Sequence, residues 1–148
     1  MKKIALFVLS FLILLLVLRL VACSDPFIGI PGGELQGTLT EVPASWGEVP
    51  DTIQFETRPS DPYSINIWAV VVDGDLYVAT KEANWVPFIA ADPRVRVRID
   101  GKLYELTATR TVSDEDMVAL TAAYSAKYDY AFTDDEGDEA QAFRLTAR

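Results

Sequence analysis

The sequence has no histidine and only one cysteine, Cys23, among its 148 residues. The absence of histidine excludes imidazole-based catalytic triads, histidine-ligated zinc sites and histidine acid–base chemistry. A single cysteine cannot form a disulfide within the chain, so the fold must be stable without covalent cross-links. Any chemistry must therefore come from carboxylates, hydroxyls, lysine and arginine, or from a bound cofactor.

Basic residues are also scarce. The first 22 residues contain three of the 13 Lys and Arg side chains and none of the 22 Asp and Glu side chains, which leaves residues 23–148 with 10 basic and 22 acidic groups. Proteins bind nucleic acids by clustering Lys and Arg against the phosphates. The composition therefore argues against a nucleic-acid partner.

The N-terminal segment contains the one long apolar run. Two lysines precede a mostly apolar stretch over residues 4–18, and Arg19 follows it. This order is typical of a signal peptide. The next four residues, LVAC, match a bacterial lipobox, in which the cysteine is lipidated and becomes the new N terminus. We therefore predict that Cys23 is lipidated.

This interpretation divides the chain into a lipoprotein-type signal peptide (1–22), a Pro- and Gly-rich linker (23–33) and one domain (34–148). The alternative is an uncleaved anchor helix over residues 4–22. Both alternatives predict an exported, membrane-anchored protein that faces the extracytoplasmic side.

Two Asp-Gly dipeptides predict β-hairpins. Asp73-Gly74 separates the apolar-rich runs 64–72 and 77–80, and Asp100-Gly101 separates runs 94–99 and 103–110. Both central positions of a type I′ turn need positive φ, which Asp and Gly tolerate better than most residues do. Each pair of runs is therefore expected to form two antiparallel strands.

The second hairpin has a predictable register. Across its two-residue turn Val97 pairs with Tyr104, and Arg96 pairs with Glu105 on the opposite face. The valine face is expected to lie in the core. The arginine row of the same strand then faces either solvent or a ligand.

The remaining elements complete a mainly β, α+β domain. We expect further strands over 33–39, 52–57 and 142–146, a short helix that Asn84 caps, and a longer helix that Ser113 caps. Six or so antiparallel strands with two helices predict a small split β-barrel. The acidic run 133–141 lacks the spacing of a calcium loop, so no metal site is predicted.

One part of the chain resembles a known family. Residues 76–110 place Lys81 and Trp85 before Asp92-Pro93 and the Asp100-Gly101 hairpin. This order resembles the FMN-binding split-barrel superfamily, which includes the pyridoxamine phosphate oxidases. It is most similar to the deazaflavin-dependent nitroreductase branch. The longer helix and the segment FRL at residues 143–145 fit the same order, so the resemblance extends from about residue 52 to the C terminus.

The resemblance implies a cofactor, FMN or a deazaflavin, and a set of residues that would hold it. Lys81 would bind the phosphate, a role that also suits a lysine close to a helix N terminus. Trp85 would pack near the cofactor, Ser64 and Asn66 would approach the ring edge, and Arg58 could add an anion contact. The alternative is that Lys81 is a surface lysine and Trp85 a core residue. The resemblance also implies a homodimer.

Two functions follow from these observations. The first is a membrane-tethered split-barrel oxidoreductase in which a flavin or deazaflavin supplies the reactivity. The second keeps the fold without the cofactor, as a lipoprotein binding or scaffold module. The sequence does not decide between the two.

Overall fold

The structure is a computed structural model that describes residues 10, 13, 25–27, 29–111, 113–131 and 140–148. Cys23, nearly all of the predicted signal or anchor segment and most of the acidic run 133–141 lie outside the described residues. In the part of the chain that is described, no helix is long and apolar enough to cross a membrane.

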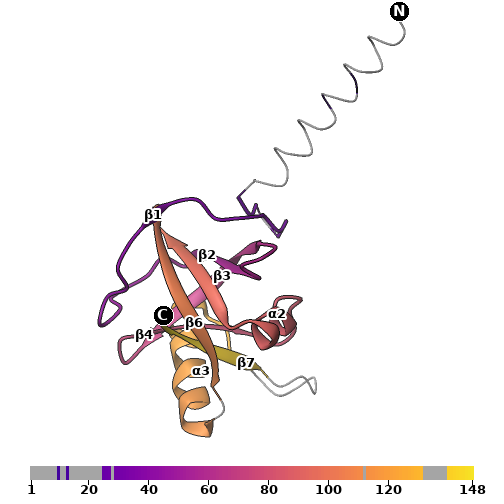
Figure 1. The fold of residues 1–148 in the computed structure, drawn as a ribbon. Helices are drawn as coiled ribbons and strands as arrows, with labels where there is room; N and C mark the ends of the chain where they lie inside the picture. The colour runs from indigo at the N-terminus through magenta and orange to yellow at the C-terminus, as the bar shows by residue number, and fades with distance from the viewer. Residues whose placement is uncertain (1–9, 11–12, 14–24, 28, 112, 132–139) are drawn as a thin grey trace, which may run out of the picture.

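Six antiparallel strands form a small closed barrel, as the sequence predicts (Figure 1). Their order is β6-β5-β2-β3-β4-β7, and β7 pairs again with β6, so the sheet closes on itself. Closure satisfies the strand edges that an open sheet would expose. The strands are β2 (Thr52–Thr57), β3 (Tyr63–Val72), β4 (Asp75–Thr80), β5 (Arg94–Ile99), β6 (Lys102–Thr111) and β7 (Gln141–Ala147).

The predicted strand over residues 33–39 is wrong in most of its length. Only β1 (Thr38–Leu39) is a strand, and it pairs in parallel with β6. The backbone groups of the preceding residues form hydrogen bonds with the side chains of Glu56 and Ser64 and one isolated bridge at Gly32. They therefore do not form a continuous β-ladder. A short parallel pairing of this kind leaves little periodicity in the sequence.

Both predicted hairpins are confirmed. Asp73 and Gly74 have φ values of 52° and 84°, and Asp100 and Gly101 have 50° and 76°. All four values are positive, as the type I′ turn requires. The predicted register is also confirmed, because Val97 pairs with Tyr104 and Arg96 with Glu105.

The barrel interior is filled by alternate side chains of the strands, among which Phe55, Val97 and Leu106 have no exposed surface. Trp85 is 3 % exposed and belongs to this core. Its ring meets Phe55 and Phe143 edge to face, with centroids 5.3 Å and 5.4 Å away. Trp85 therefore packs as a core residue, which was the alternative to a position near a cofactor.

The short helix α2 (Val86–Ala91) follows Trp85, which occupies the N-cap position, so the predicted cap at Asn84 is wrong. Pro87 lies in the first turn of the helix. At this position its missing N–H removes no helical hydrogen bond, and its fixed φ is compatible with the helix. The helix ends at Ala91, and Asp92, its C-cap, precedes Pro93. Hydrogen bonds from Arg94 hold the pKa of the Asp92 carboxyl at about 2.

The longer helix α3 (Asp114–Tyr128) begins as predicted, since the Ser113 side chain accepts a hydrogen bond from the Asp116 N–H at 3.1 Å. Leu120 and Tyr124, one helical turn apart, are buried against the outer side of β3 and β4. Figure 1 shows α3 at the bottom of the barrel, away from β1.

Lys127, near the end of α3, fastens the helix to the barrel. Its ammonium group donates hydrogen bonds to the backbone carbonyls of Val49 (2.8 Å), Pro50 (3.0 Å) and Ala69 (3.0 Å). Burial lowers the pKa of Lys127, against the opposing effect of Asp51 and Glu48. One cation therefore joins α3, the segment before β2 and the middle of β3.

Replacing Lys127 with Met should destabilise the protein by about 1–3 kcal/mol, because partly buried carbonyls lose their donor. The exposed Lys102→Met, at the start of β6, is the matched control and should change stability by less than about 0.5 kcal/mol. Urea unfolding of the full chain measures both. Equal effects of the two substitutions would show that the three hydrogen bonds do not stabilise the fold.

Candidate functional site

Two rows of polar side chains cross the outer face of three neighbouring strands, β5, β2 and β3. Residues that pair across the strands share a face, and every second residue of a strand points to it. The first row contains Arg96, Glu56 and Ser64, and the second contains Arg98, Gln54 and Asn66. We call these the first and second polar rows.

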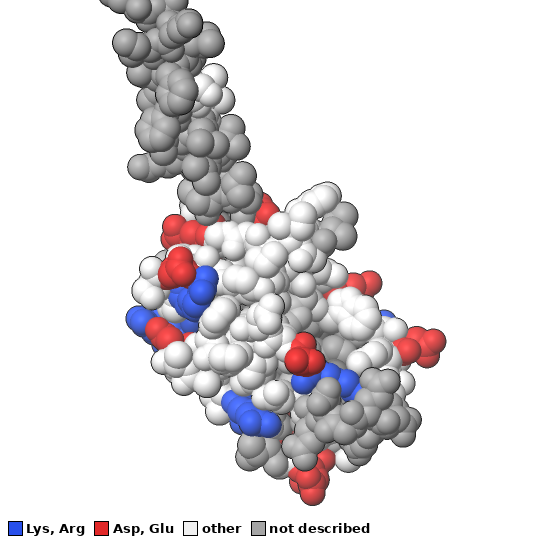
Figure 2. All heavy atoms as spheres, turned by 90° about the vertical axis from the view of Figure 1, so that its right-hand side faces the viewer, with Lys and Arg blue, Asp and Glu red and all other residues white. Residues whose placement is uncertain are grey.

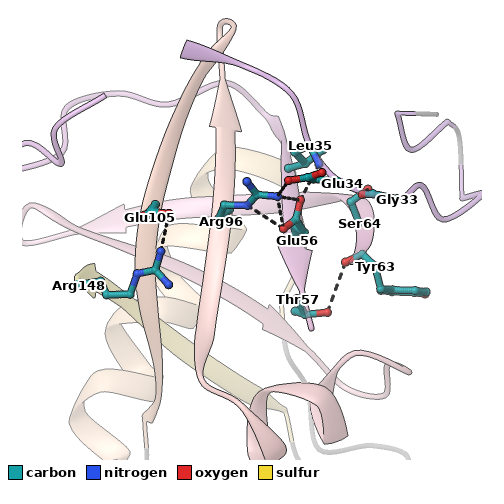
Figure 3. Close-up of polar contacts among 10 residues, drawn as sticks. All are labelled: Gly33, Glu34, Leu35, Glu56, Thr57, Tyr63, Ser64, Arg96, Glu105 and Arg148. Carbon is teal, nitrogen blue, oxygen red and sulfur yellow. Dashed lines mark hydrogen bonds and ion pairs between the residues drawn. The ribbon is translucent and has the colours of Figure 1, made fainter. Parts of the chain in front are cut away.

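An N-terminal segment lies across both rows. We call residues 25–27 and 29–37 the strap. Gly32 and Ser64 exchange two backbone hydrogen bonds, of 2.8 Å and 3.0 Å. The Ser64 hydroxyl donates to the Gly33 carbonyl at 2.7 Å, and the Leu35 N–H donates to a Glu56 carboxylate oxygen at 2.6 Å (Figure 3). The strap is thus bound by the first row through backbone and side-chain groups.

The first row contains a buried ion pair. Glu56 is 2 % exposed, and Arg96 donates to its two oxygens from Nε and Nη2, each at 2.8 Å (Figure 3). A carboxylate at this depth needs a paired cation, because isolated burial of a charge is costly. Burial lowers the pKa of Arg96, but hydrogen bonds and charge from Glu56 and from Glu34 of the strap outweigh it, so the net pKa is raised.

The second row binds the strap at three further residues. Arg98 donates to the Asp25 carboxylate at 2.6 Å, to the Gln36 carbonyl at 2.7 Å and, through Nε, to the Gln54 side chain. Asn66 donates from Nδ2 to the Pro26 carbonyl at 3.0 Å. These contacts hold both ends of the strap on the sheet.

Two hollows lie along the rows. The smaller has a volume of about 170 Å³ and the larger about 460 Å³. Small-molecule sites usually fall between about 300 and 1,000 Å³, so only the larger one is of that size. The smaller is lined by Glu34, Glu56, Pro59, Arg94, Val95, Arg96, Glu105 and Arg148, and the larger by Pro50, Thr52, Gln54, Asn66, Arg98, Ile99, Asp100 and Gly101.

The five predicted cofactor-binding residues occupy different surroundings. Ser64 and Asn66 lie on one face of β3, beneath the strap. Trp85 is in the core. Arg58 lies in the loop between β2 and β3. It forms an ion pair with Asp61, and its guanidinium lies over the ring of Phe88. Lys81 is half-buried between β4 and α2.

The groups on this face do not fit an anionic ring cofactor while the strap is in place. The side-chain donors of Ser64 and Asn66 already bond to strap carbonyls. Arg96 and Arg98 are each paired with a carboxylate. A phosphate would have to displace that partner and leave a carboxylate unpaired. Figure 2 shows the wider pattern, with basic side chains next to acidic ones on the face drawn.

The sequence did not predict that Glu56 and the strap take part in this site. Glu56 pairs with Arg96 from 40 residues away, and Asp25 reaches Arg98 across 73 residues. The signal that was present is the arginine row of β5, which was expected to face either solvent or a ligand, and two of its members, Arg96 and Arg98, contact the strap. The strap itself has the Pro and Gly content of a linker, which hides its contacts.

No family model and no curated protein matches this chain. Solved structures do match it. A conserved hypothetical protein from Mycobacterium tuberculosis superposes with a TM-score of 0.56 at 20 % identity, over 67 % of this chain and 74 % of that one.

Two further structures carry descriptive names. A candidate pyridoxamine 5′-phosphate oxidase from Listeria innocua has a TM-score of 0.53 at 14 % identity, over 66 % of this chain and 83 % of that one. A FAD-binding protein from Mesorhizobium loti has a TM-score of 0.52 at 14 % identity, over 67 % and 80 %. This chain therefore has the split-barrel fold of the pyridoxamine phosphate oxidase-like proteins, as its sequence predicts.

Replacing Glu56 with Gln should destabilise the protein by about 2–4 kcal/mol, because Arg96 loses its buried charged partner and keeps only the exposed Glu34. Glu105→Gln is the matched control, since its ion pair with Arg148 is solvent-exposed and should contribute less than about 1 kcal/mol. Thermal and urea unfolding measure both. If Glu56→Gln is no more damaging than Glu105→Gln, the buried pair does not stabilise this face.

Proposed function

We propose that this chain is a membrane-tethered split-barrel protein that works without a flavin-type cofactor, as a binding or scaffold module. One observation carries the proposal. The strap uses the side-chain hydrogen bonds of Ser64 and Asn66, the two residues predicted to approach a cofactor ring. A fold that binds a planar cofactor on this face would need those groups available.

The tether is supported by the order of features along the chain. An apolar segment and a lipobox precede the strap, and the strap begins to bind the barrel at Asp25. The first described contact between the strap and the barrel therefore lies two residues after Cys23. In either form of the tether, as a lipidated cysteine or as an anchor helix, the barrel is held close to the membrane surface.

We expect a ligand to bind in the larger of the two hollows, which lies along the second polar row. Its polar groups are the Thr52 hydroxyl, the Gln54 and Asn66 amides, the Arg98 guanidinium and the Asp100 carboxylate. The two charged groups balance each other, and Arg98 is also paired with Asp25. Such a lining favours a small neutral polar molecule over a phosphate, which needs unpaired cations.

A flavin- or deazaflavin-dependent oxidoreductase is the second candidate. It is favoured by the likeness in fold to the FAD-binding protein and to the candidate pyridoxamine 5′-phosphate oxidase. For this function the strap would have to leave the polar rows before a cofactor could reach them. The homodimer that the sequence resemblance implies remains a prediction.

The full chain, purified in detergent, should contain no flavin chromophore and should give no saturable change in fluorescence when FMN, FAD or a deazaflavin is added. The reason is the occupied donors of Ser64 and Asn66. Absorption spectra and fluorescence titrations measure this directly. One equivalent of copurified or tightly bound flavin would overturn the cofactor-free proposal.

A variant with a loosened strap separates the two candidates. Gly32→Pro removes the N–H that bonds to the Ser64 carbonyl, and Asp25→Asn removes the ion pair with Arg98. The matched control is Asp61→Asn, which breaks an ion pair away from the strap. We expect no flavin binding by either variant. Binding by the loosened variant alone would support the oxidoreductase, with the strap covering its site.

A further inference from the structure

Two large apolar side chains project from the strap into solvent. Phe27 is 65 % exposed and Ile30 is 64 % exposed. We call them the apolar pair. Their backbones exchange two hydrogen bonds, of 3.0 Å and 2.7 Å, which close a tight reverse turn, and Gly29 within it has a φ of 76°. The bridge therefore places the two side chains next to each other where the turn begins and ends, and both are in solvent although neighbouring Pro26 is buried.

The apolar pair cannot be hidden by a small rearrangement of a loose tail. Asn66 binds the carbonyl before the turn, and Arg98 binds Asp25. After the turn, Gly32 forms its two-way bridge with Ser64. The turn is thus fixed to the barrel on both sides. Two adjacent apolar side chains that are fixed outward in this way are suited to contact something apolar, and the place of the turn in the chain decides what that is.

The position of the turn in the chain indicates what that is. Phe27 follows Cys23 by four residues, and four extended residues span at most about 14 Å. Lipidation of Cys23, or an anchor helix over residues 4–22, places residue 23 at the membrane surface. The polar layer on each side of the hydrocarbon core is about 5–8 Å thick. The apolar pair must therefore lie within reach of that layer.

We propose that Phe27 and Ile30 insert into the interfacial layer of the bilayer and fix the orientation of the barrel on the membrane. This inference rests on the membrane tether of the proposed function. Apolar and aromatic side chains are favourable at that depth. Because residues 23–148 carry an excess of acidic groups, zwitterionic lipids suit the contact better than anionic ones.

The same structure supplies a matched control. Val118 on α3 is 71 % exposed, as open as the apolar pair. In Figure 1, α3 lies at the bottom of the barrel, whereas the strap, drawn in indigo to purple, runs along the top. A barrel that rests on the membrane through the strap must hold Val118 away from the lipid.

The test uses the full chain in phosphatidylcholine vesicles whose acyl chains carry bromine, a quencher of tryptophan. Phe27→Trp is compared with Val118→Trp, and both retain the three native tryptophans as a common background. When the vesicles are added, we expect the emission of Phe27→Trp to shift to the blue and lose intensity, and the emission of Val118→Trp to change no more than that of the unmodified protein. Ile30→Trp repeats the test on the second member of the pair, in case one variant folds poorly.

Flotation of the vesicles separates two kinds of failure. Protein that floats with the vesicles but shows equal quenching at positions 27, 30 and 118 would overturn the insertion of the apolar pair and leave the tether standing. Such protein would hold Phe27 and Ile30 in solvent or against a protein partner. Protein that does not float with the vesicles would overturn both the tether and the insertion.

Discussion

The buried carboxylate of Glu56 is the interaction on which the outer face of this barrel depends. It neutralises Arg96 from the next strand and also accepts the Leu35 N–H of the strap. Without the guanidinium, a carboxylate that is 2 % exposed would be a buried charge without its cation, which is costly. Without the strap, one of its oxygens would lose a hydrogen bond and much of its cover. The ion pair and the closed strap therefore stabilise each other.

The occupied polar rows are the reason for the proposal that this chain shares a fold with the matched structures without using a flavin-type cofactor. The six-stranded barrel is shared with proteins whose names refer to FAD or to pyridoxamine phosphate oxidation. A barrel of this kind is a scaffold, and its activity depends on the groups that its surface presents. Here Ser64 and Asn66 are used internally, by backbone carbonyls of the same chain. The likeness in fold does not by itself assign a cofactor to this chain, and the internal hydrogen bonds of these two side chains argue against one.

Much of the fold could be predicted because its signals are local. The Asp100-Gly101 turn fixed the register of β5 on β6, and Ser113 fixed the start of α3. The cap of α2 was mispredicted because Asn84 is a good capping residue by type, whereas the first helical hydrogen bond runs from the Ile89 N–H to the Trp85 carbonyl. The site was harder to predict, since the partners of Glu56 lie 21 and 40 residues away and no pattern links them.

The strap is the central element of the account, because it closes the polar rows and presents the apolar pair. Amide hydrogen exchange, resolved to single residues, tests it most directly. The account predicts that the Gly32, Leu35 and Ser64 amides exchange as slowly as their neighbours in β2 and β3, since each donates a hydrogen bond between strap and sheet. Exchange of Gly32 and Leu35 at the rate of an unstructured chain, while the strands stay protected, would contradict it.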